Sequence, residues 1–223
     1  MSRSTLPMIF RAAALAVAAS MAPAAWADDD ANDWREGKWV QWIYSIPASV
    51  NPFTDTTGEH CMVGQNGSTW YLASHSGGGT VSRTCTLLQG VKLRFPVAGS
   101  SYVYAPGHCG DVDGIPDSEL RALIAAVTDK LKVAVRLNGV PVATKRVRSK
   151  VFATALPSDN LFGPVCGSSP VPAGLYRTVD DTYYAEIDTL PPGVHTLELI
   201  ATNDSNFNQN LVYTLNVVPR PRH

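Results

Sequence analysis

The 223-residue sequence predicts a mainly β protein: an antiparallel β-sandwich, of the jelly-roll or immunoglobulin-like kind, with one substantial amphipathic helix. Three observations lead to this prediction. Short runs rich in β-branched and aromatic residues alternate with glycine- and asparagine-rich breaks, which is typical of strands joined by tight turns. One segment, 117–131, has the apolar spacing of a helix instead. Four cysteines follow a segment typical of an export leader, so disulfides can brace the sheets.

Residues 1–27 are typical of a secretory signal peptide. Arg3 and Arg11 carry positive charge, Ala12–Ala19 is apolar, and Ala25-Trp26-Ala27 places small residues before a cleavage point. The apolar stretch is too short to span a bilayer, which takes about 20 such residues. We therefore expect a mature chain of 223 − 27 = 196 residues. We expect it to be periplasmic or extracellular, with no transmembrane segment once the leader is cleaved.

The mature chain is large enough to bury a core without help from metals or disulfides. It shows no internal repeat and no low-complexity linker. We therefore expect one compact β-rich unit over 28–218, with an N-terminal part at 34–132 and an immunoglobulin-like part at 133–218. Residues 219–223 are expected to form a flexible tail.

The first element of the mature chain is ambiguous. Three tryptophans and Ile46 recur at helical spacing between 34 and 46, and Pro47 ends the run. Gly37 weakens the helix prediction, and a strand through 39–44 remains the alternative. The tryptophans are interpreted as core anchors rather than carbohydrate-stacking platforms, because large aromatic side chains mostly supply buried area.

Strands are predicted wherever β-type runs lie between turn signals. Their ranges are 69–73, 80–88, 91–97, 133–137, 140–142, 151–156, 183–187, 194–201 and 211–218. Asn66-Gly67 and Asn138-Gly139 predict hairpins, because a type I′ turn needs positive φ at both central residues. Strands that follow one another without intervening helices predict antiparallel pairing.

The helix is predicted from five apolar residues at the spacing i, i+3, i+4, i+7 and i+11, which form one stripe. They are Leu120, Leu123, Ile124, Val127 and Leu131. Asp117 or Ser118 is expected to cap the first turn, and Glu119 suits the positive end of the helix dipole.

Charge excludes one class of partner. Removing the two leader arginines leaves 18 − 2 = 16 basic side chains against 19 acidic ones. The one basic cluster, 145–150, alternates Arg146 and Arg148 with apolar or small residues, as one face of a strand would. An exported acidic protein has no electrostatic reason to seek phosphate, so no nucleic-acid partner is expected.

The four cysteines are expected to form two disulfides. Three pairings are possible, and the sequence alone does not choose among them. We favour Cys61–Cys85 and Cys109–Cys166, because each closes a loop around glycine-rich connections and the loops do not interleave. In the chain-entropy model these loops are worth roughly 3.5 and 4 kcal/mol. A zinc site is the alternative, although the sequence has no Cys-x-x-Cys pair.

No cofactor is expected, although Asp111, Asp113 and Asp117 are candidate calcium ligands. Carboxylates at alternate positions followed by Gly114 resemble the calcium loops of thrombospondin-type and dockerin-like repeats. Calcium takes about six to eight oxygen ligands. Against a calcium site, Ile115 stands where an EF-hand loop needs its third ligand, and Asp117 is also explained as a helix-start residue.

No residue is predicted to be catalytic, although three are candidates. His75 lies between two serines in a glycine-rich loop, but the Gly-x-Ser-x-Gly elbow of serine hydrolases is absent. Asp181, beside Asp180, and Glu186 would supply paired carboxylates for glycoside hydrolysis, which needs about 5 to 9 Å between them. Turn and strand-surface roles account for both equally well.

Residues 203–210 form an amide-rich loop between the last two predicted strands. Asn203, Asn206 and Asn208 can hydrogen-bond sugar hydroxyls, and Phe207 offers a stacking face. These four are the candidate ligand-binding residues. Such residues are also common in ordinary hairpin loops.

Several motifs follow one another along the mature chain: Trp39-x-x-Trp42-x-x-Ser45-Ile46-Pro47, Gly58-x-x-Cys61-x-x-Gly64-Gln65, Trp70-Tyr71-Leu72-Ala73 and Arg83-Thr84-Cys85. Together they resemble a widespread group of small exported bacterial proteins to which no activity is assigned. The resemblance implies export and paired cysteines. It implies no catalytic residue.

The sequence therefore favours an exported, disulfide-stabilised protein with a non-enzymatic binding or envelope-associated role, for which a glycan or an envelope component is a candidate partner. A secreted hydrolase acting on polysaccharide or cell-wall material is one alternative. A structural or adhesion subunit is another. A convergent acidic pair in a cleft would favour the hydrolase, an aromatic shelf would favour binding, and a long uncovered edge strand would favour assembly.

Overall fold

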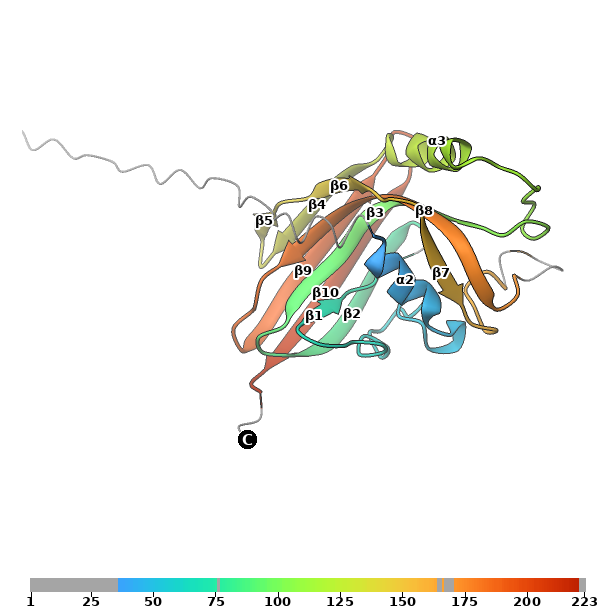
Figure 1. Cartoon of the computed structure of the whole chain (residues 1–223). Coiled ribbons are helices and arrows are strands. Elements are labelled where there is room, and N and C mark those ends of the chain that lie inside the picture. Colours follow the sequence, from blue (N-terminus) through green and yellow to red (C-terminus); the bar gives the residue numbers. More distant parts are fainter. Residues whose placement is uncertain (1–35, 76, 164–165, 167–170, 221–223) are drawn as a thin grey trace, which may run out of the picture.

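The computed structural model describes residues 36–75, 77–163, 166 and 171–220. The predicted signal peptide at 1–27 and the last three residues of the predicted tail lie outside these ranges. The described chain is mainly β and forms two five-stranded sheets of mixed strand orientation (Figure 1). Each described helix is too short or too polar to cross a membrane.

Both sheets draw strands from the two halves of the chain. The first sheet runs in the order β1 (Thr69–Tyr71), β3 (Lys92–Tyr104), β8 (Gly174–Ile187) and β6 (Lys145–Arg148), with β7 (Phe152–Leu156) also paired to β8. The second runs β2 (Gly79–Leu88), β10 (Asn208–Val218), β9 (Gly193–Thr202), β4 (Lys132–Leu137) and β5 (Val140–Val142). Strands from 34–132 and from 133–218 therefore lie side by side in each sheet.

The expectation of antiparallel pairing throughout is wrong at two places. β1 pairs parallel with β3, and β2 pairs parallel with β10 along its whole length. The chain crosses from one sheet to the other between β1, β2 and β3, so sheet neighbours are not neighbours in sequence. Turn signals constrain only consecutive strands, and therefore they do not predict these pairs.

The two Asn-Gly signals have different outcomes. Asn138 and Gly139 have φ of 51° and 81°, and they join β4 to β5 with Leu137 opposite Val140. That hairpin is confirmed. Asn66-Gly67 forms only an isolated bridge to Thr69, and β1 takes its partner from β3 instead. The second predicted hairpin is therefore wrong, because the segment before Asn66 is not a strand.

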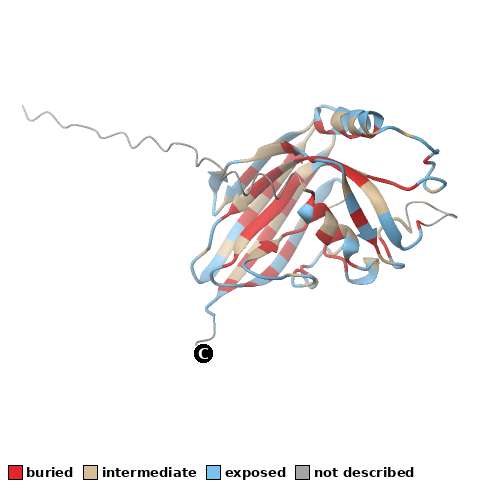
Figure 2. Ribbon diagram, in the orientation of Figure 1, coloured by how far each residue is buried: buried red, intermediate tan, exposed pale blue. Residues whose placement is uncertain are grey.

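The main core lies between the two sheets (Figure 2). Leu93 and Phe95 of β3 belong to the same buried cluster as Leu197 of β9 and Leu211 and Leu215 of β10. Along β9 and β10 buried and less buried residues alternate, as expected for strands that turn one face to the core.

The tryptophan-rich segment forms helix α2 (Lys38–Ser45), followed by a short 3₁₀ turn, η1 (Ala48–Val50). Gly37 precedes the helix with φ of 69°, and a Cβ there would lie 2.2 Å from the Phe152 ring. Glycine is thus required at the position before α2, and Gly37 does not argue against the helix. Trp39 and Trp42 are buried, as their interpretation as core anchors requires; Trp34 lies outside the described residues.

Helix α3 (Asp117–Thr128) lies across β3 and β8 at one end of the sheets (Figure 1). Only half of its apolar stripe is covered: Leu120 and Ile124 are buried, whereas Leu123 and Val127 are 48% and 51% exposed. The predicted side-chain cap is wrong, because Pro116 occupies the N-cap position and no side chain caps the helix.

The cysteines pair as Cys61–Cys85 and Cys109–Cys166, and none is free. This confirms the favoured pairing. The first disulfide ties the loop after η1 to β2, and the second joins the segment after β3 to the segment after β7.

Candidate ligand pocket

A pocket of about 370 Å³ lies where α2, β3, β8 and α3 meet Ser74, His75 and Gly77 and the β9–β10 loop. Its walls are mostly aromatic and aliphatic, with Trp39, Phe53, Val97, Leu161 and Phe207 among them. Its volume falls within the range of about 300 to 1,000 Å³ that small-molecule sites occupy. Val127 of α3 and Gly77 line the pocket and are exposed, so it opens to solvent beside these two residues.

A β-bulge in β3 shapes one wall. The register with β8 shifts between Pro96 and Ala98, and Pro96 has no N–H to offer to the ladder. In a regular strand only alternate residues face one side. Here all six residues from 96 to 101 line the pocket. A continuous stretch of β3 that contains the bulge therefore borders the ligand space, with small residues from Ala98 to Ser101.

Asp180 of β8 is the one carboxyl group among the described pocket-lining residues. It is buried, and its two oxygens accept hydrogen bonds from Thr182 Oγ1 and Tyr184 Oη, both at 2.8 Å. Burial raises the pKa of Asp180 to about 7; the two hydrogen bonds oppose this rise, and the charge of Asp181 adds to it. An isolated buried carboxyl with a raised pKa in a cleft is a typical mark of a functional site.

His75 is the second titratable side chain of interest in the pocket. Its Nε2 is buried and has no hydrogen-bond partner among the described residues. A buried nitrogen without a partner is costly, so it offers an incoming ligand a contact that the protein itself does not satisfy.

Most other polar groups of the walls are already engaged. Trp39 Nε1 donates to the Leu72 carbonyl at 2.9 Å, and Tyr44 Oη lies 3.2 Å from Ser101 Oγ. Gln209 Nε2 donates to the Val97 carbonyl at 3.4 Å. The pocket thus presents an apolar surface with few polar groups left for a ligand.

The amide-rich loop is divided between the pocket and the solvent. Asn203 and Phe207 line the pocket, whereas Asn206 and Asn208 are exposed and do not. Asn203 Oδ1 accepts the backbone N–H groups of Ser205 and Phe207, at 2.8 and 3.0 Å. Asn203 therefore shapes the loop, and Phe207 supplies the contact surface.

Asp181 lies on the opposite face of β8 from Asp180, since side chains alternate along a strand. Arg146 Nε donates to its Oδ1 at 2.6 Å and Arg146 Nη2 to its Oδ2 at 2.8 Å, and Arg148 lies 3.2 Å away. This pairing accounts for the alternating arginines of the basic cluster. Asp181 is engaged in a buried ion pair and does not line the pocket.

Glu186 also lies away from the pocket. It faces Arg94 across β3 and β8, with Arg94 Nε 3.4 Å from Oε2. Asp181 and Glu186 are five residues apart on one strand, roughly 16 Å along its axis and on opposite faces. Glycoside hydrolysis needs a carboxyl pair about 5 to 9 Å apart, which this arrangement does not supply.

The three candidate calcium ligands are not brought together. Asp111 accepts hydrogen bonds from Tyr102 Oη and from the Ala105 N–H, at 2.5 and 2.7 Å. Asp117 lies 2.9 Å from Arg177, and Asp113 is exposed. Within the described ranges, no three His, Cys, Asp or Glu side chains are grouped so as to hold a metal ion.

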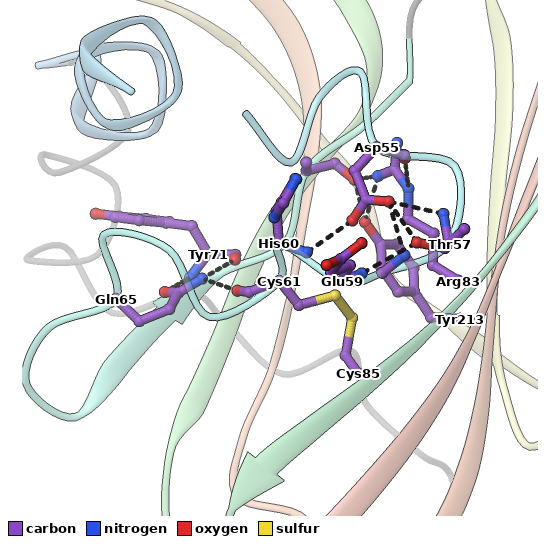
Figure 3. The surroundings of a disulfide bond; sticks show 12 residues. Asp55, Thr57, Glu59, His60, Cys61, Gln65, Tyr71, Arg83, Cys85 and Tyr213 are labelled. Carbon is purple, nitrogen blue, oxygen red and sulfur yellow. Dashed lines mark hydrogen bonds between the residues drawn. A yellow bond between two sulfur atoms is a disulfide. The ribbon is translucent and has the colours of Figure 1, made fainter. Parts of the chain in front are cut away.

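Arg83 holds two segments of the pocket wall, although in the sequence it stands out only as part of the Arg83-Thr84-Cys85 motif. Figure 3 shows it beside the Cys61–Cys85 disulfide. It is buried on β2, and its guanidinium donates to four backbone carbonyls and one hydroxyl. The carbonyls belong to Phe53, Asp55, Ala73 and Ser74. Two of these residues, Phe53 and Ser74, line the pocket, so Arg83 positions two of its wall segments.

Asp55 fixes the conformation of the loop at 55–60, which follows the pocket-lining residue Phe53 (Figure 3). Its carboxylate accepts the backbone N–H groups of Thr57, Gly58 and His60 and the Thr57 hydroxyl. Burial raises the pKa of Asp55, but these hydrogen bonds outweigh it and lower the pKa to about 2. The Cys61–Cys85 disulfide closes the loop onto β2 beside Arg83.

No family model, curated protein or solved structure matches this chain.

Proposed function

We propose that this protein is an exported, non-enzymatic binding protein, and that its pocket in a two-sheet β-sandwich takes a compact, mostly apolar small molecule. One observation carries the proposal: a ligand-sized pocket with aromatic and aliphatic walls, in which Asp180 and His75 are the main polar contacts that remain. Few oriented polar groups in an apolar cleft are the usual composition of a small-molecule site. The two disulfides fit an oxidising environment.

A glycan remains a second candidate ligand, because Trp39, Phe53 and Phe207 place aromatic side chains around the pocket. It has less support. A sugar presents many hydroxyl groups, each of which loses free energy on burial unless it finds a partner. Asn203 Oδ1 and Gln209 Nε2 are already hydrogen-bonded within the protein.

The hydrolase and assembly alternatives also have less support. The pocket holds one carboxyl rather than a convergent pair among its described lining residues. The ten-residue strand β2 is an edge of its sheet, but the Thr84 N–H donates to the Thr57 carbonyl of the overlying loop. Gly58 lies so close to Thr84 that a Cβ would be 2.4 Å from its carbonyl oxygen. This edge is therefore partly covered.

Fluorescence titration with N-phenyl-1-naphthylamine, a neutral apolar probe, tests the proposal. Two matched variants on α3 locate the site. Val127→Trp fills the pocket mouth, whereas Leu123→Trp lies one turn away, is similarly exposed and does not line the pocket. We expect the wild type to bind the probe saturably. The affinity of Val127→Trp should be at least about tenfold lower, a change of about 1.4 kcal/mol in binding free energy, and that of Leu123→Trp should equal the wild-type affinity.

Absence of saturable binding to the wild type, or equal binding by both variants, contradicts the proposal. A glycan array probed with the mature protein forms the parallel arm. Glycan binding that Val127→Trp abolishes, without binding of the apolar probe, would favour the second candidate.

A further inference from the structure

The pocket wall contains a buried carboxyl group that lacks a cationic partner. Among the described residues, Asp180 contacts only neutral groups: the Thr182 and Tyr184 hydroxyls through its oxygens and Ser149 Oγ through its backbone N–H. An ionised carboxylate has about four acceptor sites, of which the two hydroxyls use two. Two acceptor sites on Asp180 therefore remain for a donor in the pocket.

The basic groups nearby are directed elsewhere. No lysine or arginine is found among the described residues that line the pocket. Arg146 and Arg148 pair with Asp181 on the other face of β8. The titratable groups that share a face with Asp180 or line its pocket are thus Tyr184 on β8, Tyr44 on α2 and His75. Asp181 acts on Asp180 from the opposite face of β8. Lys145 of β6 lies opposite Tyr184 and is not among the residues that line the pocket. An ionised Asp180 makes this pocket electrically negative.

We propose that the ligand carries a basic nitrogen, and that its ammonium group pairs with the Asp180 carboxylate while its apolar body occupies the rest of the pocket. This inference rests on the proposed binding function and names the class of ligand. A buried carboxylate is costly without a cation and much less so with one. An ammonium group donates up to three hydrogen bonds, enough for the two open acceptor sites. An anionic ligand would be repelled.

A pH dependence follows from the state of the carboxyl. Burial raises the pKa of Asp180 to about 7, so its ionised fraction increases between pH 5.5 and pH 8. An aliphatic ammonium stays charged throughout this range, since amines of this kind have a pKa near 10. Burial also raises the pKa values of Tyr44 and Tyr184, which therefore remain neutral. Affinity for an amine should rise with pH, and affinity for a neutral analogue should not.

Isothermal titration calorimetry with three probes that share a phenyl body separates the possibilities. The probes are 2-phenylethylamine (cationic), 2-phenylethanol (neutral) and 3-phenylpropanoate (anionic). For the wild type at pH 8 we expect the amine to bind at least about tenfold more tightly than the alcohol, and the carboxylate to bind most weakly. Between pH 5.5 and pH 8 the affinity for the amine should rise about tenfold or more.

Two variants assign the effect to Asp180. Asp180→Asn keeps the shape of the side chain and removes its charge, so the amine should lose its advantage and its pH dependence while the alcohol still binds. His75→Gln removes the other titratable contact of the pocket, so it can lower the affinity for every probe, but the amine preference and its pH dependence should persist in it. Thermal melts check that both variants are folded, and the wild-type pH profile is decisive even if Asp180→Asn does not fold.

The outcomes distinguish the two proposals. If the alcohol and N-phenyl-1-naphthylamine bind but the amine has no advantage, the inference about the ligand class is overturned and the binding function stands. If neither the neutral probes nor the amine binds, both are overturned. Loss of the pH dependence in His75→Gln would assign the effect to His75 and also overturns the inference.

Discussion

Arg83 Nη1 donates a 2.7 Å hydrogen bond to Tyr213 Oη, and Tyr213 Oη in turn donates to the carbonyl of Ala73. This chain joins β2 to β10 and both strands to the segment that carries Ser74 and His75. The hydrogen bonds of a charged, buried guanidinium are individually strong. These hydrogen bonds explain how the segment that carries Ser74 and His75 keeps a defined position in the pocket wall although glycines follow it.

Replacing Arg83 tests that role. Arg83→Met removes a donor from four backbone carbonyls, of which, among the described residues, only that of Ala73 keeps a second donor in Tyr213 Oη, and should lower the free energy of unfolding by about 3 to 5 kcal/mol. Tyr213→Phe removes one hydroxyl and should cost about 1 kcal/mol. Urea denaturation measures both. Arg136→Met, an exposed arginine on β4, is the control and should change stability by no more than about 0.5 kcal/mol. A similar loss for Arg83→Met and Arg136→Met would contradict this account.

Stability should depend on pH through Asp180. Its pKa of about 7 in the folded protein lies above the value near 3.9 expected for an unfolded chain, so between these pH values the folded state holds a proton that the unfolded state has lost. The stabilisation is present in full below about pH 4 and is lost as pH rises through about 7. The difference is on the order of 4 kcal/mol at about 1.36 kcal/mol per pKa unit.

Urea denaturation at pH 5 and pH 8 measures the part of this difference that falls between the two pH values, about 2.6 kcal/mol. Asp180→Asn should flatten the dependence and be more stable than the wild type at pH 8. Asp55 acts in a separate range: its pKa of about 2 means that its contribution is lost only as pH falls below about 4. An unchanged pH profile in Asp180→Asn would contradict the assignment.

Gly99 should tolerate no side chain. It faces Thr182 across β3 and β8, and a Cβ there would lie 2.3 Å from Thr182 Oγ1 and 2.4 Å from Thr182 Cα. Gly99→Ala forces the strands apart, at about 1 to 3 kcal/mol, and should also weaken probe binding because Thr182 holds Asp180. Gly163→Ala is the matched control, since among the described residues its Cβ would meet only the Asn160 carbonyl, at 3.6 Å. Equal melting temperatures for both variants would refute the prediction.

The Cys61–Cys85 disulfide should be worth roughly 3.5 kcal/mol, because it closes a loop of about 25 residues in the unfolded chain. Replacing both cysteines with serine and measuring urea denaturation tests this value. Hydrogen exchange should show loss of protection in residues 55–65, the loop that the bond holds to β2. A variant that keeps wild-type stability would show that Asp55 and Arg83 suffice to hold the loop.

Local structure could be predicted from the sequence to a considerable extent. The strand positions, the α3 segment and the Asn138-Gly139 hairpin depend on short-range patterns. The disulfide pairing, favoured among three possibilities because its loops do not interleave, is confirmed. β8 is longer than its predicted core at 183–187, because it begins at Gly174. Its first half carries polar residues, such as Asp180, that local propensity does not assign to a buried strand.

Strand partners could not be predicted, because they depend on contacts between distant segments. The parallel pairing of β2 with β10 joins residues about 130 positions apart, and no turn signal reports it. The pocket is likewise formed by segments that are distant in the sequence. His75, Asn203 and Phe207 were selected from loop composition and all three line it, but Asp180 rather than Asp181 faces the pocket. Which of two adjacent residues points inward depends on strand register, which the sequence does not reveal.

The central place of β10 in its sheet has a consequence for how the chain acquires its structure. β10 follows all the other strands of the two sheets in chain order, and yet it separates β2 from β9 and supplies Leu211 and Leu215 to the core. A nascent chain that has not yet been extended through Val218 cannot assemble this layer. Folding of the layer therefore has to await synthesis of β10, with the slow kinetics of long-range strand association.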